Sequence, residues 1–502
     1  MGAPQATRRE WIGLGVLALP CLLYSMDLTV LNLAVPRLAQ DLKPSASQLL
    51  WIVDIYGFLL AGALITMGTL GDRIGRRKLL MIGATVFGLV SVLAAFAPSA
   101  QLLIAARALL GLAAATLAPS TLSLIRNMFL DDRQRTLAIG IWGASFSAGA
   151  AIGPFVGGLL LERFWWGSVF LASVPVMALL LILAPRLLPE FRDPKCGRMD
   201  LTSAALSLGA VLSVIYGIKR MSEMLRFSAE HALFIGLGLV LAVLFVRRQR
   251  RIADPLIDLA MFRIPALPVA LIINIIGLFA AFGFFLLIGQ YFQLALGMGP
   301  LEAGLWSAPS GPAFVIGSLL TPALAHRVGR ANLLAAAFIV GAIGLIVIAY
   351  AAAHPNMTLF ITGYVTFCLG IAPMGTLTTD IVMSTVPPER AGAASGISET
   401  SFELGGALGI ALLGSFVTAL YRSATVGIPP IANVDIAAAR ATLAGAVAVT
   451  RGLPPEIGEP VLRIAREAFV GAFTQAALVA AALCVVVAII SLTVLRRSSV
   501  AR

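Results

Sequence analysis

The residues with the clearest capacity for chemistry are carboxylic acids that stand inside long apolar stretches. They are Asp27, Asp54, Asp380, Glu399 and Glu403. An ionised side chain in the middle of a bilayer costs at least about 3 kcal/mol, so an acid kept there is a functional candidate. A carboxyl group in a low-dielectric cavity has a raised pKa and exchanges protons near neutral pH. A lipophilic cation that reaches it favours the ionised form and displaces the proton, which is the simplest physical route to cation:proton antiport.

The spacing of these acids strengthens that interpretation. Glu399 and Glu403 stand four residues apart, on one face of a helix, and two like charges close together raise the pKa of one of the two groups. Asp27 lies well inside the first apolar stretch, where we expect Arg107 as its charge partner. We expect Asp27, Asp54 and Glu403 to carry proton coupling or cation recognition, with Glu399 and Asp380 as further candidates.

Each acid also has a structural interpretation that the sequence leaves open. Asp27 can be a packing acid paired with Arg107, and Asp54 can be a solvated residue near the membrane surface. The two glutamates can face cytoplasmic water near the start of their helix. Asp380 is better explained as an acid next to a loop, where it holds Arg390.

Aromatic residues fall near the same parts of the predicted helices. They are Tyr24, Tyr56, Trp142, Trp306 and Phe402. The face of an aromatic ring attracts a cation, so these rings are candidates for stacking on flat cationic compounds in a cavity. The alternative is that they belong to the core or to the aromatic belts at the membrane interfaces.

A run of small residues points to a moving part. It contains Gly149, Gly153, Gly157 and Gly158, together with Pro154. Glycines four residues apart allow two helices to approach closely, and a proline inside a helix removes a backbone hydrogen bond and bends it. We expect a conformational hinge against the opposite half of the molecule, with ordinary small-residue packing as the alternative.

The elements that must position these residues are membrane-spanning helices. Of the 502 residues, 59% are hydrophobic and only 12% are charged, which is more apolar surface than a water-soluble fold can bury. Fourteen stretches are long enough to span a bilayer, near 12–35, 49–70, 79–97, 101–125, 137–161, 167–188, 201–218, 231–247, 267–293, 303–325, 332–352, 357–383, 396–421 and 468–495. The sequence therefore predicts an all-α membrane protein. The segment 422–467, with Pro429, Pro430 and an amphipathic stretch at 456–469, is expected to be an external loop or short-helix excursion.

The distribution of charge predicts the orientation in the membrane. Most of the 36 Lys and Arg residues fall on the side that holds both termini, which indicates cytoplasmic termini. The net charge of +12 is spread over many short loops and makes no basic stripe, so nucleic acid is not an expected partner.

Other kinds of chemistry find little support in the sequence. The cysteines, Cys21, Cys196, Cys368 and Cys484, lie far apart and form no metal-binding or disulfide pattern. The three histidines lie at the margins of the apolar stretches, and the sequence contains no phosphate-binding loop motif. We expect a transporter rather than an enzyme, with no metal and no cofactor, and with the proton gradient as its source of energy.

A short loop at residues 68–80 is repeated in the second half of the chain. It reads GTLGDRIGRRKLL, and a weaker version, AHRVGR, follows about 254 residues later at 325–330. Such a repeat is what a duplicated transporter would leave. We predict a six-helix half at 1–190, two inserted helices at 191–260, and a second six-helix half at 261–502.

Four motifs together resemble the major facilitator superfamily, and specifically its fourteen-spanner drug:proton antiporters. They are the loop at 68–80, the stretch 103–115 with Arg107 and Gly111, the glycine-rich stretch 149–158, and the helix-one motif at 26–36. The stretch 51–56 further resembles the quaternary-ammonium exporters of that family.

The resemblance implies a major facilitator fold that exports lipophilic mono- and dicationic compounds by proton-coupled alternating access. It implies a multi-pass protein of the bacterial cytoplasmic membrane, and we expect a monomer. In the loop, the resemblance assigns a gating role to Gly68, Asp72, Arg73, Gly75 and Arg76, and implies that Asp72 pairs with neighbouring helix ends and arginines. From its place in the loop, Asp72 can also cap the start of the following helix. Two departures weaken the match to the quaternary-ammonium exporters. The stretch 303–325 has no acid beyond Glu302 at its margin, and His326 stands where the first loop has Asp72.

Two other functions remain open at this point. The chain could export another amphiphile, such as a tetracycline-like drug, a bile salt or a siderophore. It could also be a membrane sensor that transports nothing. We expect such a sensor to carry an appended soluble domain, and the sequence indicates none.

Overall fold

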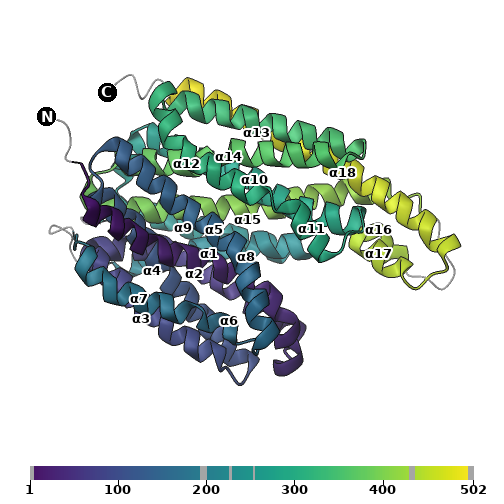
Figure 1. Cartoon of the computed structure of the whole chain (residues 1–502), viewed down its shortest axis with the longest axis horizontal. Helices are drawn as coiled ribbons and strands as arrows, with labels where there is room; N and C mark the ends of the chain where they lie inside the picture. Colours follow the sequence, from purple (N-terminus) through teal and green to yellow (C-terminus); the bar gives the residue numbers. More distant parts are fainter. Residues whose placement is uncertain (1–4, 193–199, 225–228, 253–254, 429–435, 496–502) are drawn as a thin grey trace.

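The structure is a computed structural model that describes residues 5–192, 200–224, 229–252, 255–428 and 436–495. In that part of the chain every regular element is a helix (Figure 1). The first group comprises α1 Arg8–Leu42, α2 Ala46–Ile74, α3 Arg76–Ala95, α4 Ala100–Met128, α5 Asp132–Arg163, α6 Ser168–Leu171 and α7 Ser173–Leu187. Then come α8 Leu201–Met224, α9 Ala229–Gln249 and η1 Leu259–Arg263. The last group comprises α10 Ala266–Gln290, η2 Tyr291–Ala295, α11 Pro300–Ser307, α12 Ser310–Val328, α13 Arg330–Ala353, α14 Met357–Thr385, η3 Pro388–Arg390, α15 Ala391–Ala424, α16 Ile436–Ala441, α17 Leu443–Thr450, α18 Pro455–Ile490 and η4 Ser491–Leu495.

Polar residues at the helix ends show why the long apolar stretches stop where they do. Ser45 and Gln48 form a capping box at the start of α2, in which each side chain accepts a hydrogen bond from the other residue's amide. The side chains of Ser99 and Asp131 cap the first turns of α4 and α5. These caps satisfy backbone amides that would otherwise lack partners at the helix starts.

The predicted spans fall in helices of the structure, while the total of fourteen spans stays a prediction. Twelve described segments are long and apolar enough to cross a membrane. The two other predicted stretches lie in α1 and α5, which have 35 and 32 residues. An α-helix of that length extends over about 50 Å, which exceeds the thickness of a bilayer core.

Three predicted elements differ in detail from the structure. The stretch 167–188 is divided into α6 and α7, and the stretch 303–325 is divided into α11 and α12. In the segment 422–467 the structure has the short helices α16 and α17, while Pro429 and Pro430 lie outside the described residues. The amphipathic stretch at 456–469 is not a separate excursion, because α18 runs without a break from Pro455 to Ile490.

The packing of the helices repeats along the chain. The contacts of α1 with α5, α2 with α4, and α3 with α4 and α7 recur as contacts of α10 with α15, α12 with α14, and α13 with α14 and α18. Between the two groups, α2 contacts α15, and α5 contacts α12. Figure 1 shows the two groups side by side, with the start of α1 and the end of α18 at the same end of the bundle. The domain boundaries near 190 and 260 stay predictions.

The repeated loop has the same backbone conformation in both copies. Gly75, between α2 and α3, has φ +110°, and Gly329, between α12 and α13, has φ +83°. Residues other than glycine are strained at such a positive φ, which explains why both copies have a glycine there. The two positions are 254 residues apart, the period found in the sequence.

The helices α8 and α9, which correspond to the predicted insertion, pack against each other and against the seam between the two groups. α8 contacts both α2 and α15. At one end of this pair, Arg248 Nε lies 2.6 Å from Asp200 Oδ2, and Ser203 donates a 2.7 Å hydrogen bond to the same carboxylate. Together these groups hold the pKa of the Asp200 carboxyl well below its usual range.

Candidate functional site

Two of the predicted site residues meet where the first group of helices contacts the second. The phenol of Tyr24, on α1, donates a 2.7 Å hydrogen bond to Glu403 Oε1, on α15. Both side chains are half-buried. A carboxylate in this position touches a hydrogen-bond donor from the opposite group of helices, so its protonation state can affect how the two groups pack.

The predicted pair of Asp27 and Arg107 is confirmed. Arg107 Nη1 lies 2.5 Å from Asp27 Oδ2, and Arg107 Nε donates a 3.2 Å hydrogen bond to the carbonyl of Ile52. The guanidinium is 1% exposed and lies 4.5 Å from the centre of the Tyr56 ring. A buried charge needs compensation of this kind, and the pair supplies it. Because Asp27 is three residues from Tyr24, both lie on the same side of α1.

Aromatic rings connect the two acidic positions. The ring centre of Tyr24 lies 6.5 Å from that of Tyr56 and 5.4 Å from that of Phe146. Phe146 in turn lies 4.8 Å from Trp142, edge to face. The indole of Trp142 donates a 3.0 Å hydrogen bond to Thr121 on α4. Tyr24, Tyr56, Phe146 and Trp142, contributed by α1, α2 and α5, therefore form one contiguous group, which we call the aromatic cluster.

Glu399 lies one helical turn before Glu403 on the same face of α15. Its side chain is 9% exposed. Among the described residues, its Oε1 atom has no hydrogen-bond partner. A buried carboxyl oxygen without a hydrogen-bond partner is energetically costly, so Glu399 can accept a further polar or cationic group.

The remaining predicted residues are placed less centrally. Asp54 is half-buried on α2, two residues from Tyr56, so the two side chains point to different sides of that helix. Phe402 is half-buried and packs on the main core. Trp306 is 39% exposed on α11, which packs against η2, and so the structure does not bring it into the aromatic cluster.

Asp72 makes a second contact between the two groups of helices. It lies in the last turn of α2 and is 2% exposed. Its carboxylate accepts hydrogen bonds from the amides of Gly392 at 2.9 Å and Ala393 at 3.0 Å, at the start of α15. Arg76 binds the same carboxylate at 2.8 Å and donates to the carbonyl of Pro388 at 2.6 Å. We call this set of contacts the α2–α15 latch.

The latch corrects one expectation and fulfils another. The position of Asp72 in the sequence suggests that it caps the next helix, but α2 continues past it and the carboxylate caps α15 instead. The partners that the resemblance implies, an arginine and a neighbouring helix end, are the ones observed. A negative charge at a helix N-terminus is stabilised by the orphan amides and by the helix dipole. Gly68 also belongs to this contact, because a Cβ there would lie 2.2 Å from the Gly392 carbonyl oxygen.

Asp380 lies in a separate ionic cluster and not beside the glutamates. It is fully buried near the end of α14, where its carboxylate contacts Arg135 at 3.2 Å and Arg330 at 2.7 Å. Thr136 donates a further hydrogen bond at 3.0 Å. The suggested partner, Arg390, is therefore wrong, since the arginines come from the starts of α5 and α13.

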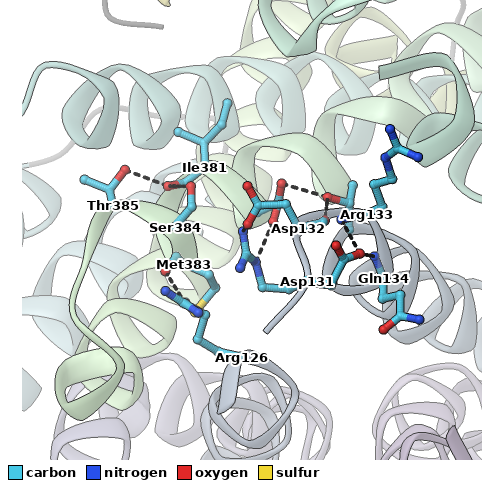
Figure 2. Close-up of polar contacts among 12 residues, drawn as sticks. Arg126, Asp131, Asp132, Arg133, Gln134, Ile381, Met383, Ser384 and Thr385 are labelled. Atoms are coloured by element: carbon cyan, nitrogen blue, oxygen red, sulfur yellow. Dashed lines mark hydrogen bonds and ion pairs between the residues drawn. The ribbon is translucent and has the colours of Figure 1, made fainter. Parts of the chain in front are cut away.

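Figure 2 shows how this region brings the end of α14 against the start of α5. There Ser384 and Thr385 both donate hydrogen bonds to the Ile381 carbonyl, and Arg126 of α4 reaches the Met383 carbonyl at 2.8 Å. The Asp380 cluster thus joins α5 to the second group, as the α2–α15 latch joins α15 to the first.

The glycines of the predicted hinge face α1 rather than the opposite group. A Cβ at Gly149 would lie 2.2 Å from the Leu22 carbonyl oxygen, and one at Gly157 would lie 2.8 Å from Val30. Gly158 is exposed, Gly153 is buried, and the side chain of Pro154 lies outside the described part of the chain. The close contacts of these two glycines are therefore within the first group, and the hinge against the opposite half stays a prediction.

The loop at 68–80 has a partner that sequence reasoning missed. Glu190 accepts hydrogen bonds from the amides of Arg77 at 3.0 Å and Lys78 at 3.1 Å, and so caps the start of α3. Nothing in the spacing signals this, because Glu190 is a single acid that follows a span. Thr121 and Phe146 were missed for the same reason, since only the fold brings them to the aromatic cluster. Arg73 is half-buried in the same loop.

A buried polar group in the second set of helices was also missed. Asn274 of α10 donates a 3.2 Å hydrogen bond to Ser401 of α15 and accepts one from Thr378 of α14. Satisfied buried groups of this kind fix the positions of helices that otherwise meet through apolar contacts alone.

Comparison with known proteins agrees with the fold and the motifs. Residues 17–410 match the family described as Major Facilitator Superfamily. The multidrug efflux pump LfrA of Mycolicibacterium smegmatis is 43% identical over 486 residues, and the alignment covers 96% of each chain. The methyl viologen resistance protein SmvA of Salmonella typhimurium is 34% identical over 92% of this chain and 93% of the relative.

Two solved structures share the fold at low sequence identity. The human organic anion transporter MFSD10 has a TM-score of 0.62 at 14% identity and covers 94% of this chain and 98% of its own. The proton:xylose symporter XylE has a TM-score of 0.58 at 15% identity, over 95% and 94% of the two chains. The family match and the relatives identify a multi-pass membrane protein that is a transporter and not an enzyme. The chain belongs to the Major Facilitator Superfamily.

Proposed function

We propose that this protein is a proton-coupled antiporter that exports lipophilic mono- and dicationic compounds, such as quaternary ammonium antiseptics, dyes and drugs. The observation that carries the proposal is the meeting of acids and aromatic rings between the two groups of helices. Glu403 is hydrogen-bonded to Tyr24 of the aromatic cluster, and Glu399 lies one turn away with an unpartnered carboxyl oxygen. A flat cation can stack on such rings while its charge favours ionisation of the nearby acids.

The names of the relatives support export of small molecules, and one of them supports cationic substrates in particular. The name of one relative describes a multidrug efflux pump, and that of another describes resistance to methyl viologen, an aromatic compound with two positive charges. A third, 32% identical over 80% of this chain, is named multidrug resistance protein Stp and comes from Mycobacterium tuberculosis.

The proposed mechanism needs no cofactor, because the proton gradient drives the exchange. A proton on the glutamates and a cation in the aromatic cluster compete, and each binds in one of two conformations of the carrier. In the described conformation the α2–α15 latch and the Asp380 cluster both hold the two groups together, at the end where α2 and α14 finish. We assign this end to the cytoplasm, in keeping with the charge distribution and with cytoplasmic termini. Opening there would require both contacts to break.

Proton movement in inverted membrane vesicles tests this proposal. Vesicles that contain the protein are energised so that the interior becomes acidic, and ethidium or a quaternary ammonium compound is then added. Collapse of the gradient, abolished in Asp27→Asn or Glu403→Gln at equal protein abundance, is the expected result. Absence of any response over a panel of such cations would contradict it.

A second candidate is export of another amphiphile, such as a tetracycline-like drug, a bile salt or a siderophore. The specific support is a relative named tetracenomycin C resistance and export protein, 28% identical over 96% of this chain. Glu302, the acid at the margin of the stretch 303–325, is exposed rather than buried among the helices. Gradient collapse by neutral amphiphiles, but not by cations, would favour this candidate.

A further inference from the structure

One turn of α15 carries three buried polar side chains with atoms that have no partner. Ser395 and Ser398 are fully buried, and Glu399 is 9% exposed. Among the described residues, no hydrogen-bond partner reaches either serine hydroxyl or Oε1 of Glu399. Residues at positions i, i+3 and i+4 of a helix are neighbours on its surface, so these three groups form one patch.

The two serine hydroxyls differ from others on the same helix. Thr400 donates to the Gly396 carbonyl at 2.7 Å, and Ser401 donates to the Ser398 carbonyl at 2.6 Å. Such bonds to the preceding turn are the usual way in which a helix satisfies a buried hydroxyl. Ser395 and Ser398 make no such bond, so their hydroxyls remain available to another group.

The patch lies on α15 between the α2–α15 latch and Glu403. Gly392, whose amide binds Asp72, precedes Glu399 by seven residues, or about 10 Å along the helix axis. Ser395 falls between them, about 6 Å from Glu399 along that axis. Side chains four residues apart on a helix are neighbours, with Cβ atoms about 5–6 Å from each other, so one water molecule can bridge their polar atoms.

Buried polar groups without protein partners are the usual binding places of internal water, which needs two to four polar contacts. We propose that Ser395 and Ser398 hold water against Glu399 and relay protons between that carboxyl and the latch end of α15. The inference rests on the proposed function, since it supplies the proton path that antiport requires. The ligand is water, and the serines act as positioning residues through it.

Each proton transfer in the relay conserves atoms and charge. The Glu399 carboxyl gives its proton to a water oxygen, and that water gives a different proton to Ser395 Oγ. The serine releases its original hydroxyl proton to a second water on the side of Asp72. Every O–H bond that forms matches one that breaks, and no oxidant or reductant takes part. Rotation of the hydroxyl then restores the starting arrangement.

Two transport modes of the purified protein in liposomes separate a relay from a structural role. Net ethidium:proton antiport needs proton transfer in every cycle, whereas exchange of labelled against unlabelled ethidium needs none. In the double variant Ser395→Ala/Ser398→Ala, net antiport should fall at least about tenfold, as expected when a proton-transfer group is removed. Ethidium exchange and ethidium affinity should stay within about twofold of wild type.

Matched variants complete the test. The single variant Ser395→Thr keeps a hydroxyl at this position and leaves Ser398 unchanged, so its net antiport should equal that of the wild type. Ser491→Ala removes a buried hydroxyl on another helix, one that bonds to the Val487 carbonyl, and should change neither mode. Wild-type net antiport in the double variant, or an equal fall in both modes, would overturn the relay while leaving the proposed function in place. A wild-type protein that moves no protons with any cation would overturn both.

Discussion

Tyr24 and Glu403 are 379 residues apart in the chain, yet the Tyr24 phenol donates a 2.7 Å hydrogen bond to the Glu403 carboxylate. The bond joins α1, in the first group of helices, to α15, in the second. An alternating-access carrier moves two such groups relative to each other, so this contact can break or form within the transport cycle. It therefore offers a direct link between protonation of an acid and the conformation of the carrier.

Removal of this link should impair coupling before it impairs folding. Glu403→Gln should abolish proton-driven efflux of cations. Tyr24→Phe should slow it roughly tenfold or more, because a hydrogen bond to a charged group is worth about 1.5–3 kcal/mol. Efflux from loaded cells or vesicles at equal protein abundance measures both effects. Tyr350→Phe, at a tyrosine that is 58% exposed on α13, serves as the control and should transport normally.

Arg107 should matter most through the charge that it neutralises. Arg107→Gln leaves the half-buried Asp27 carboxylate without its ion-pair partner, which should lower the free energy of unfolding by about 1–3 kcal/mol, less than for a fully buried pair. Thermal unfolding in detergent gives the measurement. The double variant Arg107→Gln/Asp27→Asn has no uncompensated charge and should recover most of that loss. Equal melting temperatures for the single and double variants would show that the pair does not act in this way.

Gly68 offers a test of the α2–α15 latch. In Gly68→Ala the new Cβ would lie 2.2 Å from the Gly392 carbonyl oxygen, which forces α2 and α15 apart. We expect a shift toward the conformation that is open at this end. A cysteine introduced near the latch should then label faster, by several-fold, with a membrane-impermeant thiol reagent.

The matched control for this variant lies on the same helix. A Cβ at Gly57 would meet nothing within 4 Å, so Gly57→Ala makes the same chemical change on α2 without a clash. Labelling in Gly57→Ala should equal that in the parent. Equal labelling in both glycine variants would refute a role for close packing at the latch.

The ion pair of Asp200 with Arg248 should make a small, pH-dependent contribution to stability. Folding lowers the pKa of the Asp200 carboxyl, so the stabilisation is present above its ordinary value of 3.8 and is lost as the pH falls through the lower folded value. Because both groups are partly exposed, we expect Asp200→Asn to cost only about 0.5–1 kcal/mol at neutral pH. Unfolding curves at pH 7 and pH 3 should show a difference between variant and parent that shrinks at the lower pH. A difference that is larger at pH 3 would contradict this account.

Much of the fold follows from local sequence, because each span must satisfy its own backbone within the membrane. Apolar length alone therefore predicts where the helices run. The reason for the repeated glycine at positions 75 and 329 is likewise local, because the backbone there has a positive φ that favours glycine. The pair of Asp27 and Arg107 was predictable for a different reason, namely that a buried charge needs a partner and few are available.

Other contacts depend on which helices meet, and spacing does not reveal that. Asp380 has several arginines within reach of its end of the molecule, and the fold selects Arg135 and Arg330 over Arg390. The glycines at 149 and 157 signal close approach but not the partner, which is α1. Trp306 is an aromatic residue of the kind that lines cavities, yet it lies partly exposed on the short helix α11 and outside the aromatic cluster. In each case the missing information is a long-range contact.

Proton release by purified protein upon cation binding tests the central claim most directly. The protein is held in weakly buffered detergent solution near neutral pH, and ethidium is added while the pH and ethidium binding are followed together. The account predicts that protons are released as the wild-type protein binds ethidium, and that the double variant Glu399→Gln/Glu403→Gln releases none. Saturable ethidium binding to the wild-type protein without any proton release would contradict it.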